Sequence, residues 1–346
     1  MRGRPLMRVM QVMAGAAHGG AEAFFDRLTL ALDRAGVDQQ IVIRRNAERA
    51  ALLQPAKRPP LEFAFGGALD LVTGHRLRRA VRRFEPDILL SWMSRATRFA
   101  PIGRHVLAAR LGGYYRLANF ERCDHLVGNT RHICDYLIEA GWPRARTSYL
   151  PNFVDAVAMP PVARRSLDTP DDAPLLFALG RLHANKGFDV LLQAVAQIPG
   201  AYLWLAGEGP KQAELAQQAA RLGIADRVRF LGWRTDAPAL FAACDVFICP
   251  SRHEPLGNVV IEAWAQHRPV VAAESSGPGA LITDGVSGLL APVEDADALA
   301  AAVRRVLASP DLAATLVTGG RTAYEAEFTE AKVVARYMEF FESIMV

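Results

Sequence analysis

Residues 246–262 read Val-Phe-Ile-Cys-Pro-Ser-Arg-His-Glu-Pro-Leu-Gly-Asn-Val-Val-Ile-Glu. The apolar run that ends at Pro250 is typical of a buried parallel strand, and the helical composition from Val259 to Gln266 stops before Pro269. A strand, a short loop and a helix therefore follow one another. In an open α/β sheet ligands bind at such a place, because the free N–H groups and the positive end of the helix dipole favour phosphate.

The loop carries polar groups that suit a sugar nucleotide. Gly257 allows the backbone to approach a ligand closely, and Asn258 can cap the helix. Glu254 and Glu262 lie on either side of this glycine. We expect both carboxylates to face one crevice, one beside phosphates and the other beside a hydroxyl-rich group. The alternative is a carboxylate at a helix N-terminus and an unrelated surface acid.

Apolar runs of strand character alternate with helical patterns along the chain, which is long enough, at 346 residues and 51% apolar, for two domains. The runs cover residues 9–13, 40–43, 88–91, 106–110, 125–127 and 148–150, and then 175–179, 202–206, 228–231, 246–249, 270–273 and 288–290. A Pro-rich, acidic stretch from residue 151 to 174 separates the two series and is typical of a linker. Two doubly wound sheets joined by a hinge are the simplest solution.

The sequence indicates in which cellular compartment the protein is found. No apolar run approaches the roughly 20 residues needed to cross a bilayer. The first apolar stretch is interrupted by Arg8, Gln11 and His18, so it resembles a strand and not a signal peptide, and we expect a cytoplasmic protein. The cysteines lack disulfide or zinc spacing, and we expect reduced, mostly buried thiols at Cys123, Cys134, Cys244 and Cys249.

Basic residues concentrate in the first half. Residues 1–150 hold 24 Lys and Arg against 13 Asp and Glu, whereas the remainder holds 16 against 23. In the densest segment, 74–84, an apolar helical face (Leu77, Ala80, Val81, Phe84) is predicted beside four arginines, Arg78, Arg79, Arg82 and Arg83. Such a helix can dock on anionic lipid or an acidic saccharide, or it can be a solvated face. No nucleic-acid motif accompanies the charge.

A second candidate loop, Gly180-Arg-Leu-His-Ala-Asn-Lys-Gly187, follows the run 175–179. Its lysine is informative because the chain has only four, so arginine is the default basic residue. Arg181 and Lys186 would stabilise the negative charge that develops on a diphosphate leaving group. The alternative is a pair of surface cations that cap the loop.

In the first half, Ala17-His-Gly-Gly-Ala-Glu22 follows the run 9–13. It is not G-x-G-x-x-G, and Arg44-Arg45 ends the next strand in place of an acid, so a dinucleotide site is a weak interpretation. We expect Gly19 and Gly20 to form a flat floor facing the phosphates, with an ordinary turn as the alternative. The nearby histidines, His18, His183 and His253, lack metal-ligand spacing, so we expect no metal and no cofactor, and the bound sugar nucleotide would be the substrate.

With Gly19-Gly-Ala-Glu22, Pro151-Asn-Phe-Val-Asp155, Gly180-Arg-Leu...Lys186-Gly187, Gly207-Glu-Gly-Pro210 and Glu254...Glu262 in this order, the chain resembles the family 4 retaining glycosyltransferases of the GT-B fold. The resemblance spans nearly the whole chain and is strongest between residues 151 and 292. It implies two Rossmann-like α/β domains facing a cleft, an acceptor-side domain (1–155) and a nucleotide-sugar-binding domain (156–328). A final helix in 329–346, amphipathic over 331–345, would cross back to the first domain.

The resemblance also implies roles for the site residues. Glu254 would contact the donor sugar, and Arg181 and Lys186 would hold the diphosphate. The remaining donor contacts would come from backbone N–H groups at Leu256 and Gly257, from the helix start at Asn258, and from Glu262 on the ribose hydroxyls. Retention is usually explained in this family by front-face attack, with the leaving phosphate accepting the proton of the acceptor.

Two departures concern the donor site. Many relatives carry a histidine in the first domain, where residues 109–115 here offer glycine, so the backbone or Arg110 would have to substitute. Many also carry a glutamate in the turn after the strand at 270–273, where residues 277–280 offer alanine. Polar groups expected on the acceptor side are Tyr114, Asn119 and Asn129.

The leading prediction is a retaining transferase that moves a hexose from a nucleoside diphosphate sugar to a saccharide or lipid-linked acceptor at the cytoplasmic membrane face. The basic first half favours an anionic acceptor such as a lipopolysaccharide core or another cell-envelope glycan. One alternative is a nucleotide-sugar epimerase or hydrolase of the same fold, although the first half offers few carboxylates for it. Another is a non-catalytic sugar-nucleotide-binding protein, which the absent histidine leaves open.

Overall fold

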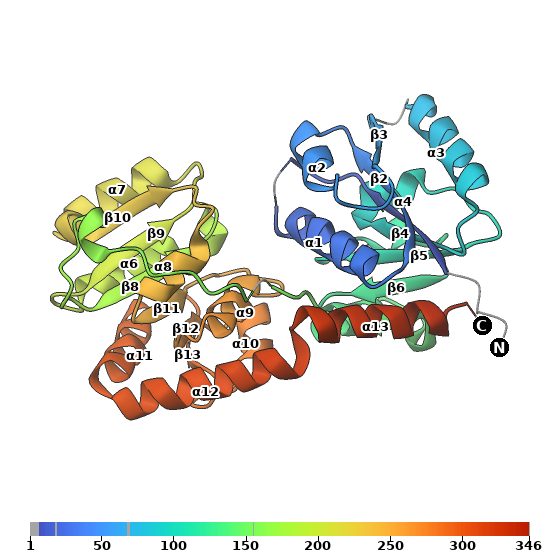
Figure 1. The fold of residues 1–346 in the computed structure, drawn as a ribbon. Coiled ribbons are helices and arrows are strands. Elements are labelled where there is room, and N and C mark those ends of the chain that lie inside the picture. The colour runs from blue at the N-terminus through green and yellow to red at the C-terminus, as the bar shows by residue number, and fades with distance from the viewer. Residues whose placement is uncertain (1–6, 18, 68–69, 155, 346) are drawn as a thin grey trace. The chain divides into compact units, whose positions relative to one another are not determined.

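The computed structural model describes residues 7–17, 19–67, 70–154 and 156–345, and the chain divides into two compact units. Unit 1 comprises Met1–Phe153 together with Glu330–Val346, and unit 2 comprises Val154–Thr329 (Figure 1). The division falls between two neighbouring buried side chains. Phe153 belongs to a core of unit 1, whereas Val154 belongs to a core of unit 2.

Unit 1 is built on a seven-stranded parallel sheet in the order β3-β2-β1-β4-β5-β6-β7. Its strands are β1 (Arg8–Met13), β2 (Asp38–Arg44), β3 (Leu61–Phe63), β4 (Ile88–Trp92), β5 (Val106–Leu111), β6 (His125–Gly128) and β7 (Thr147–Tyr149). Its helices are α1 (Gly20–Arg34), α2 (Ala47–Leu52), α3 (Leu71–Phe84), α4 (Met93–Phe99), α5 (Arg131–Glu139), α13 (Glu330–Ser343) and the short 3-10 helices η1 (Leu117–Asn119) and η2 (Arg144–Arg146).

Unit 2 is built on a six-stranded parallel sheet in the order β10-β9-β8-β11-β12-β13. Its strands are β8 (Leu175–Leu179), β9 (Tyr202–Ala206), β10 (Val228–Gly232), β11 (Val246–Cys249), β12 (Val270–Ala273) and β13 (Leu289–Ala291). Its helices are α6 (Phe188–Ala196), α7 (Gln212–Arg221), α8 (Ala237–Ala243), α9 (Asn258–Ala265), α10 (Ser276–Leu281), α11 (Ala296–Ala308), α12 (Pro310–Glu327) and the 3-10 helices η3 (Arg164–Leu167), η4 (Ala184–Lys186) and η5 (Ala225–Arg227).

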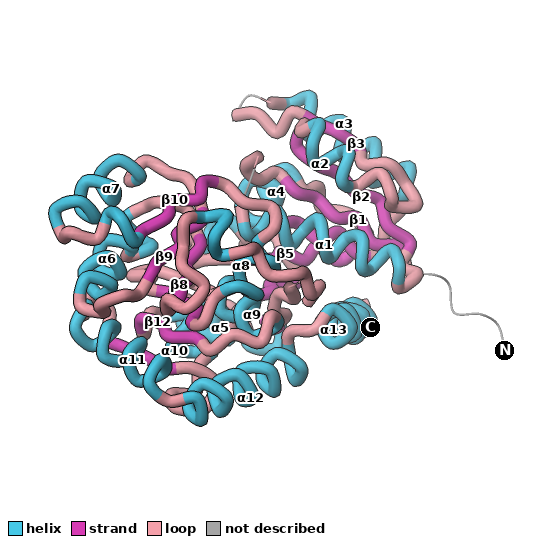
Figure 2. The backbone as a smooth tube through the Cα atoms, turned by 60° about the vertical axis from the view of Figure 1, so that its left-hand side comes forward, coloured by secondary structure: helices cyan, strands magenta, loops and turns pink. Residues whose placement is uncertain are grey.

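Both faces of each sheet are covered, as a parallel sheet requires. In β1, Val9 and Met13 pack in one core with α1 and α13, whereas Met10 and Val12 pack in the other with α3, α4 and α5. The strands of unit 2 alternate in the same way between a core with α6, α7 and α11 and a core with α8, α9 and α12. Figure 2 shows the strands of each unit enclosed by helices. The prediction of two Rossmann-like α/β domains is confirmed.

All twelve predicted runs form strands, and the strand that the sequence analysis missed is β3. The amphipathic face predicted for 74–84 is also confirmed. In α3, Leu77 and Phe84 are buried, while Arg78, Arg79, Arg82 and Arg83 are exposed.

The end of the chain completes a core of unit 1. In α13, Val333, Tyr337, Phe340 and Phe341 are buried together with residues of α1. Their spacing is the helical period that predicted an amphipathic segment at 331–345. The last element therefore packs on the domain that contains the first strand.

Arg110 links β5 to this helix and cannot serve a ligand. Its guanidinium is buried, with Nε donating to Tyr337 Oη at 2.8 Å and Nη2 bonding to Asn152 Oδ1. The guanidinium carbon also lies 4.7 Å from the ring centre of Phe24 and 4.6 Å from that of Trp92. The suggestion that Arg110 replaces the absent histidine is therefore wrong, because the side chain points into the core.

The four cysteines are buried and unpaired with one another, as predicted. Burial raises the pKa of Cys123 and Cys244 to about 12 and that of Cys134 and Cys249 to about 11.

Every helix in the described ranges is too short or too polar to span a membrane.

Candidate functional site

The crevice of unit 2 is set by its strand order. β8 lies between β9 and β11, so the connections from β8 and β11 leave the sheet in opposite directions, and in open α/β sheets ligands bind at the carboxyl ends of strands at such a switch point. The loop after β8 carries Arg181 and Lys186, and the loop after β11 carries Glu254 and leads into α9. The two loops predicted to bind a ligand thus lie on either side of the switch point.

The structure pairs Lys186 with Glu254. Lys186 Nζ donates to Glu254 Oε2, and only 22% and 13% of these side chains are exposed. Burial alone would lower the pKa of Lys186, but the attraction of the Glu254 carboxylate, with smaller effects of Cys249 and Glu262, gives a net rise. Lys186 is therefore a firmly protonated cation. Lys186, which we expected beside the diphosphate, and Glu254, which we expected beside the sugar, thus contact each other.

The N-terminus of α9 has a different cap from the predicted one. The N-cap is Gly257, with a φ of 82°, and no side chain caps the helix; Asn258 is the first helical residue. The prediction that Asn258 caps the helix is wrong, because the left-handed turn at Gly257 already aligns its carbonyl with the N–H of Val260 at 2.9 Å.

Donors and charges gather at this helix start. Among the described residues, the backbone N–H groups of Leu256 and Gly257 have no acceptor. Glu262 is half-buried in α9, and its charge contributes to the raised pKa of Lys186. Arg181 is exposed, and its guanidinium has no hydrogen-bond or ion-pair partner within the described ranges. The crevice can therefore offer two cations and backbone donors to an anionic ligand.

Backbone-to-backbone packing holds the surrounding turns. A Cβ on Gly187, which has a φ of 64°, would lie 2.1 Å from the carbonyl oxygen of Pro250, and one on Gly277 would lie 2.3 Å from that of Glu254. The N–H of Gly277 also donates to this Glu254 oxygen at 2.7 Å. The first turn of α10 thus supports the Glu254 loop.

Two polar residues at the end of β12 escaped the sequence analysis. Residues 277–280, where alanine stands in place of the glutamate of many relatives, lie within α10. An exposed carboxylate, Glu274, directly follows β12, and next to it the buried Ser275 Oγ has no hydrogen-bond partner among the described residues. The position directly after an apolar run, which drew attention to the loop after β11, would have found both.

In unit 1, Gly19 and Gly20 are exposed where β1 leads into α1. A Cβ on Gly19 would lie 2.3 Å from Glu22 Oε2, so this glycine makes room for a buried carboxylate that accepts from the N–H of Ala16 at 2.8 Å. Arg49 holds the same loop through the carbonyl oxygens of Ala16 and Ala17, at 3.2 and 2.9 Å. The phosphate-facing role of the two glycines stays a prediction, and His18 lies outside the described residues.

The residues expected on the acceptor side differ in exposure. Tyr114 is exposed and its Oη lies 2.8 Å from His132 Nδ1, and Asn119 is exposed at the end of η1. Asn129 is buried, and its Oδ1 has no hydrogen-bond partner in the described ranges. Over those ranges no three His, Cys, Asp or Glu side chains cluster as metal ligands do. The absence of a metal or cofactor stays a prediction.

Comparison with known proteins decides the family. Residues 18–157 match Glycosyltransferase Family 4, and residues 173–309 match Glycosyl transferases group 1. The lipopolysaccharide core biosynthesis glycosyltransferase LpsE of Rhizobium meliloti is 36% identical over 334 residues, which cover 94% of this chain and 96% of LpsE. The chain belongs to glycosyltransferase family 4.

Further relatives of this glycosyltransferase support the same family and fold. LpsD of Rhizobium meliloti, another lipopolysaccharide core biosynthesis glycosyltransferase, is 35% identical over 344 residues, 97% of this chain and 98% of LpsD. The crystal structure of Anabaena HepE in complex with UDP-glucose superposes with a TM-score of 0.85 at 23% identity, over 97% of this chain and all of HepE. The glycosyltransferase has the GT-B fold, and it is a nucleotide-sugar-dependent enzyme.

Proposed function

We propose that the enzyme transfers a hexose from a nucleoside diphosphate sugar to a saccharide of the lipopolysaccharide core, with retention of configuration. The observation that carries this proposal is the likeness, over nearly the full length of both chains, to two lipopolysaccharide core glycosyltransferases. The complex of HepE with UDP-glucose, in a protein of the same fold, supports a hexose donor.

The crevice of unit 2 suits the donor. In this proposal Arg181 and Lys186 bind the diphosphate, the N–H groups of Leu256 and Gly257 bind phosphate and sugar, and Glu262 binds the ribose. Because Lys186 already pairs with Glu254, the diphosphate competes for the ammonium, and its binding releases the Glu254 carboxylate to the hydroxyl groups of the sugar. No resident metal or other cofactor takes part.

The chemistry follows from this placement. The bond between the anomeric carbon and the phosphate oxygen breaks while the acceptor hydroxyl oxygen attacks the same face of the sugar. The proton of the hydroxyl passes to the departing phosphate oxygen, so the protein supplies no strong base. Its contribution is to stabilise the negative charge on the leaving diphosphate with fixed cations and the α9 N-terminus.

Calorimetry with UDP-, GDP- and ADP-glucose tests the donor site. At least one should bind, and Glu262→Ala should weaken that binding about tenfold, which is the loss expected for a hydrogen bond to a charged group. The control substitution is Asp226→Ala. Asp226 is exposed and lies on η5, directly before the amino end of β10, whereas the donor site is expected at the carboxyl ends of the strands. No binding of any of these nucleotides to the wild type would refute the proposal, and NMR of the product linkage tests retention.

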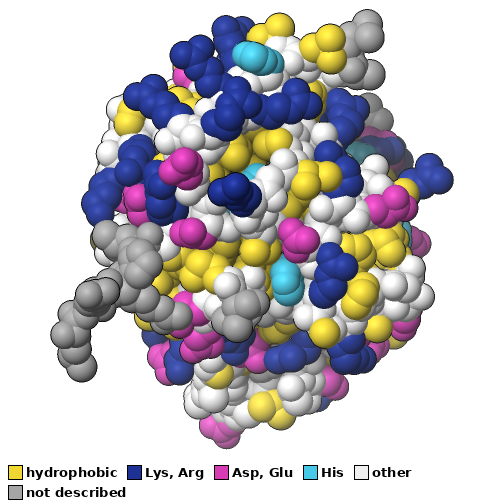
Figure 3. Space-filling model, turned by 90° about the vertical axis from the view of Figure 1, so that its right-hand side faces the viewer, with side chains coloured by type: hydrophobic (Ala, Val, Ile, Leu, Met, Phe, Trp, Pro, Cys, Tyr) yellow, Lys and Arg dark blue, Asp and Glu magenta, His cyan; other side chains and the backbone are white. Residues whose placement is uncertain are grey.

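We also propose that the basic side of unit 1 meets an anionic surface at the cytoplasmic face of the membrane, where the acceptor is held. A groove of about 1150 Å³ lies at the amino ends of β4 and β5. The Gly19–Gly20 loop follows the carboxyl end of β1 and so lies at the other end of these parallel strands. It is lined by apolar side chains, by Glu85 and Asp87, and by five arginines: Arg78, Arg82, Arg98, Arg104 and Arg122. Figure 3 shows Lys and Arg side chains crowding the upper part of this side.

Charge reversal tests this surface. Replacing Arg78, Arg79, Arg82 and Arg83 by Glu should weaken sedimentation with phosphatidylglycerol vesicles about tenfold or more, because each basic residue near an anionic surface contributes about 1 kcal/mol. Unchanged sedimentation would remove the membrane proposal. The control reverses four exposed arginines of unit 2, Arg165, Arg221, Arg304 and Arg305, with the same change in net charge.

A further inference from the structure

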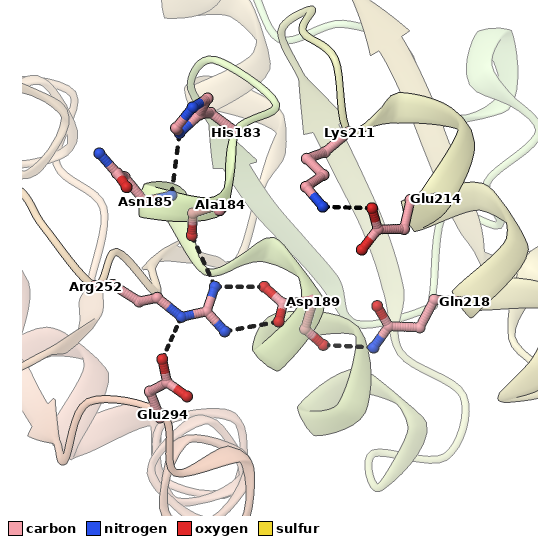
Figure 4. A network of polar contacts seen from close by, with 9 residues as sticks. All are labelled: His183, Ala184, Asn185, Asp189, Lys211, Glu214, Gln218, Arg252 and Glu294. Atoms are coloured by element: carbon pink, nitrogen blue, oxygen red, sulfur yellow. Dashed lines mark hydrogen bonds and ion pairs between the residues drawn. The ribbon is translucent and has the colours of Figure 1, made fainter.

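We propose that Arg252 is a positioning residue that fixes the Lys186 and Glu254 loops relative to each other. The inference rests on the proposed donor site in unit 2. Arg252 stands two residues before Glu254, and its side chain points toward Asp189 and Glu294 (Figure 4). It contacts η4, the first turn of α6 and the loop between β13 and α11. Two segments that are far from Arg252 in the sequence, residues 184–189 and the loop at Glu294, therefore meet at one guanidinium.

The contacts use most of the hydrogen-bonding capacity of the guanidinium. Nη1 donates to the carbonyl oxygen of Ala184 and to Asp189 Oδ1, both at 2.7 Å, and Nη2 donates to Asp189 Oδ2 at 2.7 Å. Nε donates to Glu294 Oε1. Four of the five N–H donors of an arginine side chain are thus engaged. We call these four residues, Arg252, Ala184, Asp189 and Glu294, the Arg252 latch.

The backbone strengthens the same connection. The carbonyl oxygen of Asn185 accepts from the N–H groups of Arg252 and His253, at 2.9 and 3.1 Å. Lys186 directly follows this carbonyl and precedes Asp189 by three residues. The latch and the backbone contacts therefore bracket Lys186 on one loop and end two residues from Glu254 on the other.

The charges of the latch show that it holds loops and does not bind a ligand. One guanidinium faces two carboxylates, so it has no excess positive charge to offer to a phosphate. Hydrogen bonds from Arg252 lower the pKa of Asp189, which therefore stays ionised near neutral pH. Glu294 has a φ of 67°, a conformation that residues other than glycine adopt at a cost. Its contact with Arg252 holds the carboxylate in that position.

Arginine is needed at this position for its shape. A lysine ammonium is a point charge and cannot donate along two parallel bonds to Asp189 while also reaching Glu294 and Ala184. Loss of the latch leaves both site loops tied by backbone contacts and by the Lys186–Glu254 pair, and in the proposed function the diphosphate competes for that pair. A displacement of about 1 Å between reacting groups can reduce a rate about a hundredfold. Turnover therefore depends on a residue that contacts neither sugar nor phosphate.

The test compares Arg252→Lys with the wild type in the full-length protein. Release of nucleoside diphosphate from saturating UDP-, GDP- or ADP-glucose, whichever the wild type turns over, should fall about tenfold or more. The affinity for the corresponding nucleoside diphosphate should change by less than about threefold, because that ligand is held by groups that remain. Asp189→Asn should reproduce the loss, and the double variant should be no worse than either single variant, since both substitutions break the same contact.

Unit 2 provides a matched control in Arg164. This arginine pairs with Asp245 at 2.8 Å and also donates to the carbonyl oxygen of Ala243, but it lies at the amino end of β11. Its side chain is 17% exposed and that of Asp245 is 41% exposed, close to the 21% of Arg252 and 37% of Asp189. Arg164→Lys should lower the melting temperature as much as Arg252→Lys and leave turnover within about twofold of the wild type.

The outcomes separate the latch from the proposed function. A wild type that turns over no sugar nucleotide contradicts the proposed function. A wild type that turns over donor while Arg252→Lys does so equally well contradicts the latch alone. Hydrogen exchange provides a check independent of activity. Amides in 183–187 and 251–257 should exchange faster in Arg252→Lys than in Arg164→Lys, and equal exchange would overturn the latch.

Discussion

Replacing Lys186 by alanine is expected to lower turnover by about a hundredfold to a thousandfold, the range found when one preorganised charge-stabilising donor is removed from an active site. Affinity for the nucleoside diphosphate sugar should fall less, by about tenfold, because the negative charge on the leaving phosphate is larger in the transition state than in the bound donor. Steady-state kinetics and calorimetry on the same protein measure the two effects. Equal losses in both would argue against a role at the leaving group.

Lys211→Ala is the control for this substitution. Lys211 is also a lysine of unit 2 that is paired with a glutamate, but the pair is more exposed, with 40% of Lys211 and 61% of Glu214 accessible. Turnover of this variant should stay within about twofold of the wild type, as expected for an exposed ion pair of small energy.

The titration of Lys186 should not change stability or donor binding near neutral pH. Its pKa in the folded protein lies above the usual 10.5, because the Glu254 carboxylate outweighs the effect of burial. The stability linked to the raised pKa of Lys186 is therefore fully present at neutral pH and is lost only as the pH rises from 10.5 through the higher folded value. A change in donor binding between pH 6 and 9 would have to come from another group.

The sheets were predictable because a parallel strand covered on both faces appears in sequence as a continuous apolar run. Leu175–Leu179 and Val270–Ala273 are such runs, and their predicted bounds are those of β8 and β12. β3 escaped because it has three residues, with Glu62 in the middle, and lies at the edge of its sheet. Short edge strands carry too few apolar residues to produce a pattern.

The site residues were predictable only where a single loop contains a distinctive combination of residue types. A rare lysine and a glutamate near a glycine indicated Lys186 and Glu254, although their roles stay predictions. The partners of Arg252 were not predictable, because Asp189 and Glu294 are 63 and 42 positions away and arginine is the ordinary basic residue of this chain. Arg110 shows the same limit, since Tyr337, its partner, lies 227 positions further along.

Replacing Tyr337 by alanine is expected to destabilise unit 1 by about 3–5 kcal/mol, the cost of removing a large buried aromatic side chain. Tyr337 is fully buried on α13, and its ring lies 5.9 Å from that of Phe341. The substitution also removes the oxygen that accepts from Arg110 Nε, and no carboxylate pairs with this buried guanidinium in the described ranges. Tyr337→Phe isolates the hydrogen bond and should cost about 1.5–3 kcal/mol.

Hydrogen exchange under native conditions assigns this loss to a unit, which a single unfolding curve of a two-unit chain does not do. Amides of β4 should lose protection in Tyr337→Ala, whereas those of β8 should keep it, because α13 packs in a core of unit 1. Glu339→Ala, an exposed substitution on the same helix, should change stability by no more than about 0.5 kcal/mol. Loss of protection in β8 instead of β4 would mean that the last helix stabilises the domain it follows in sequence and not the one that contains the first strand.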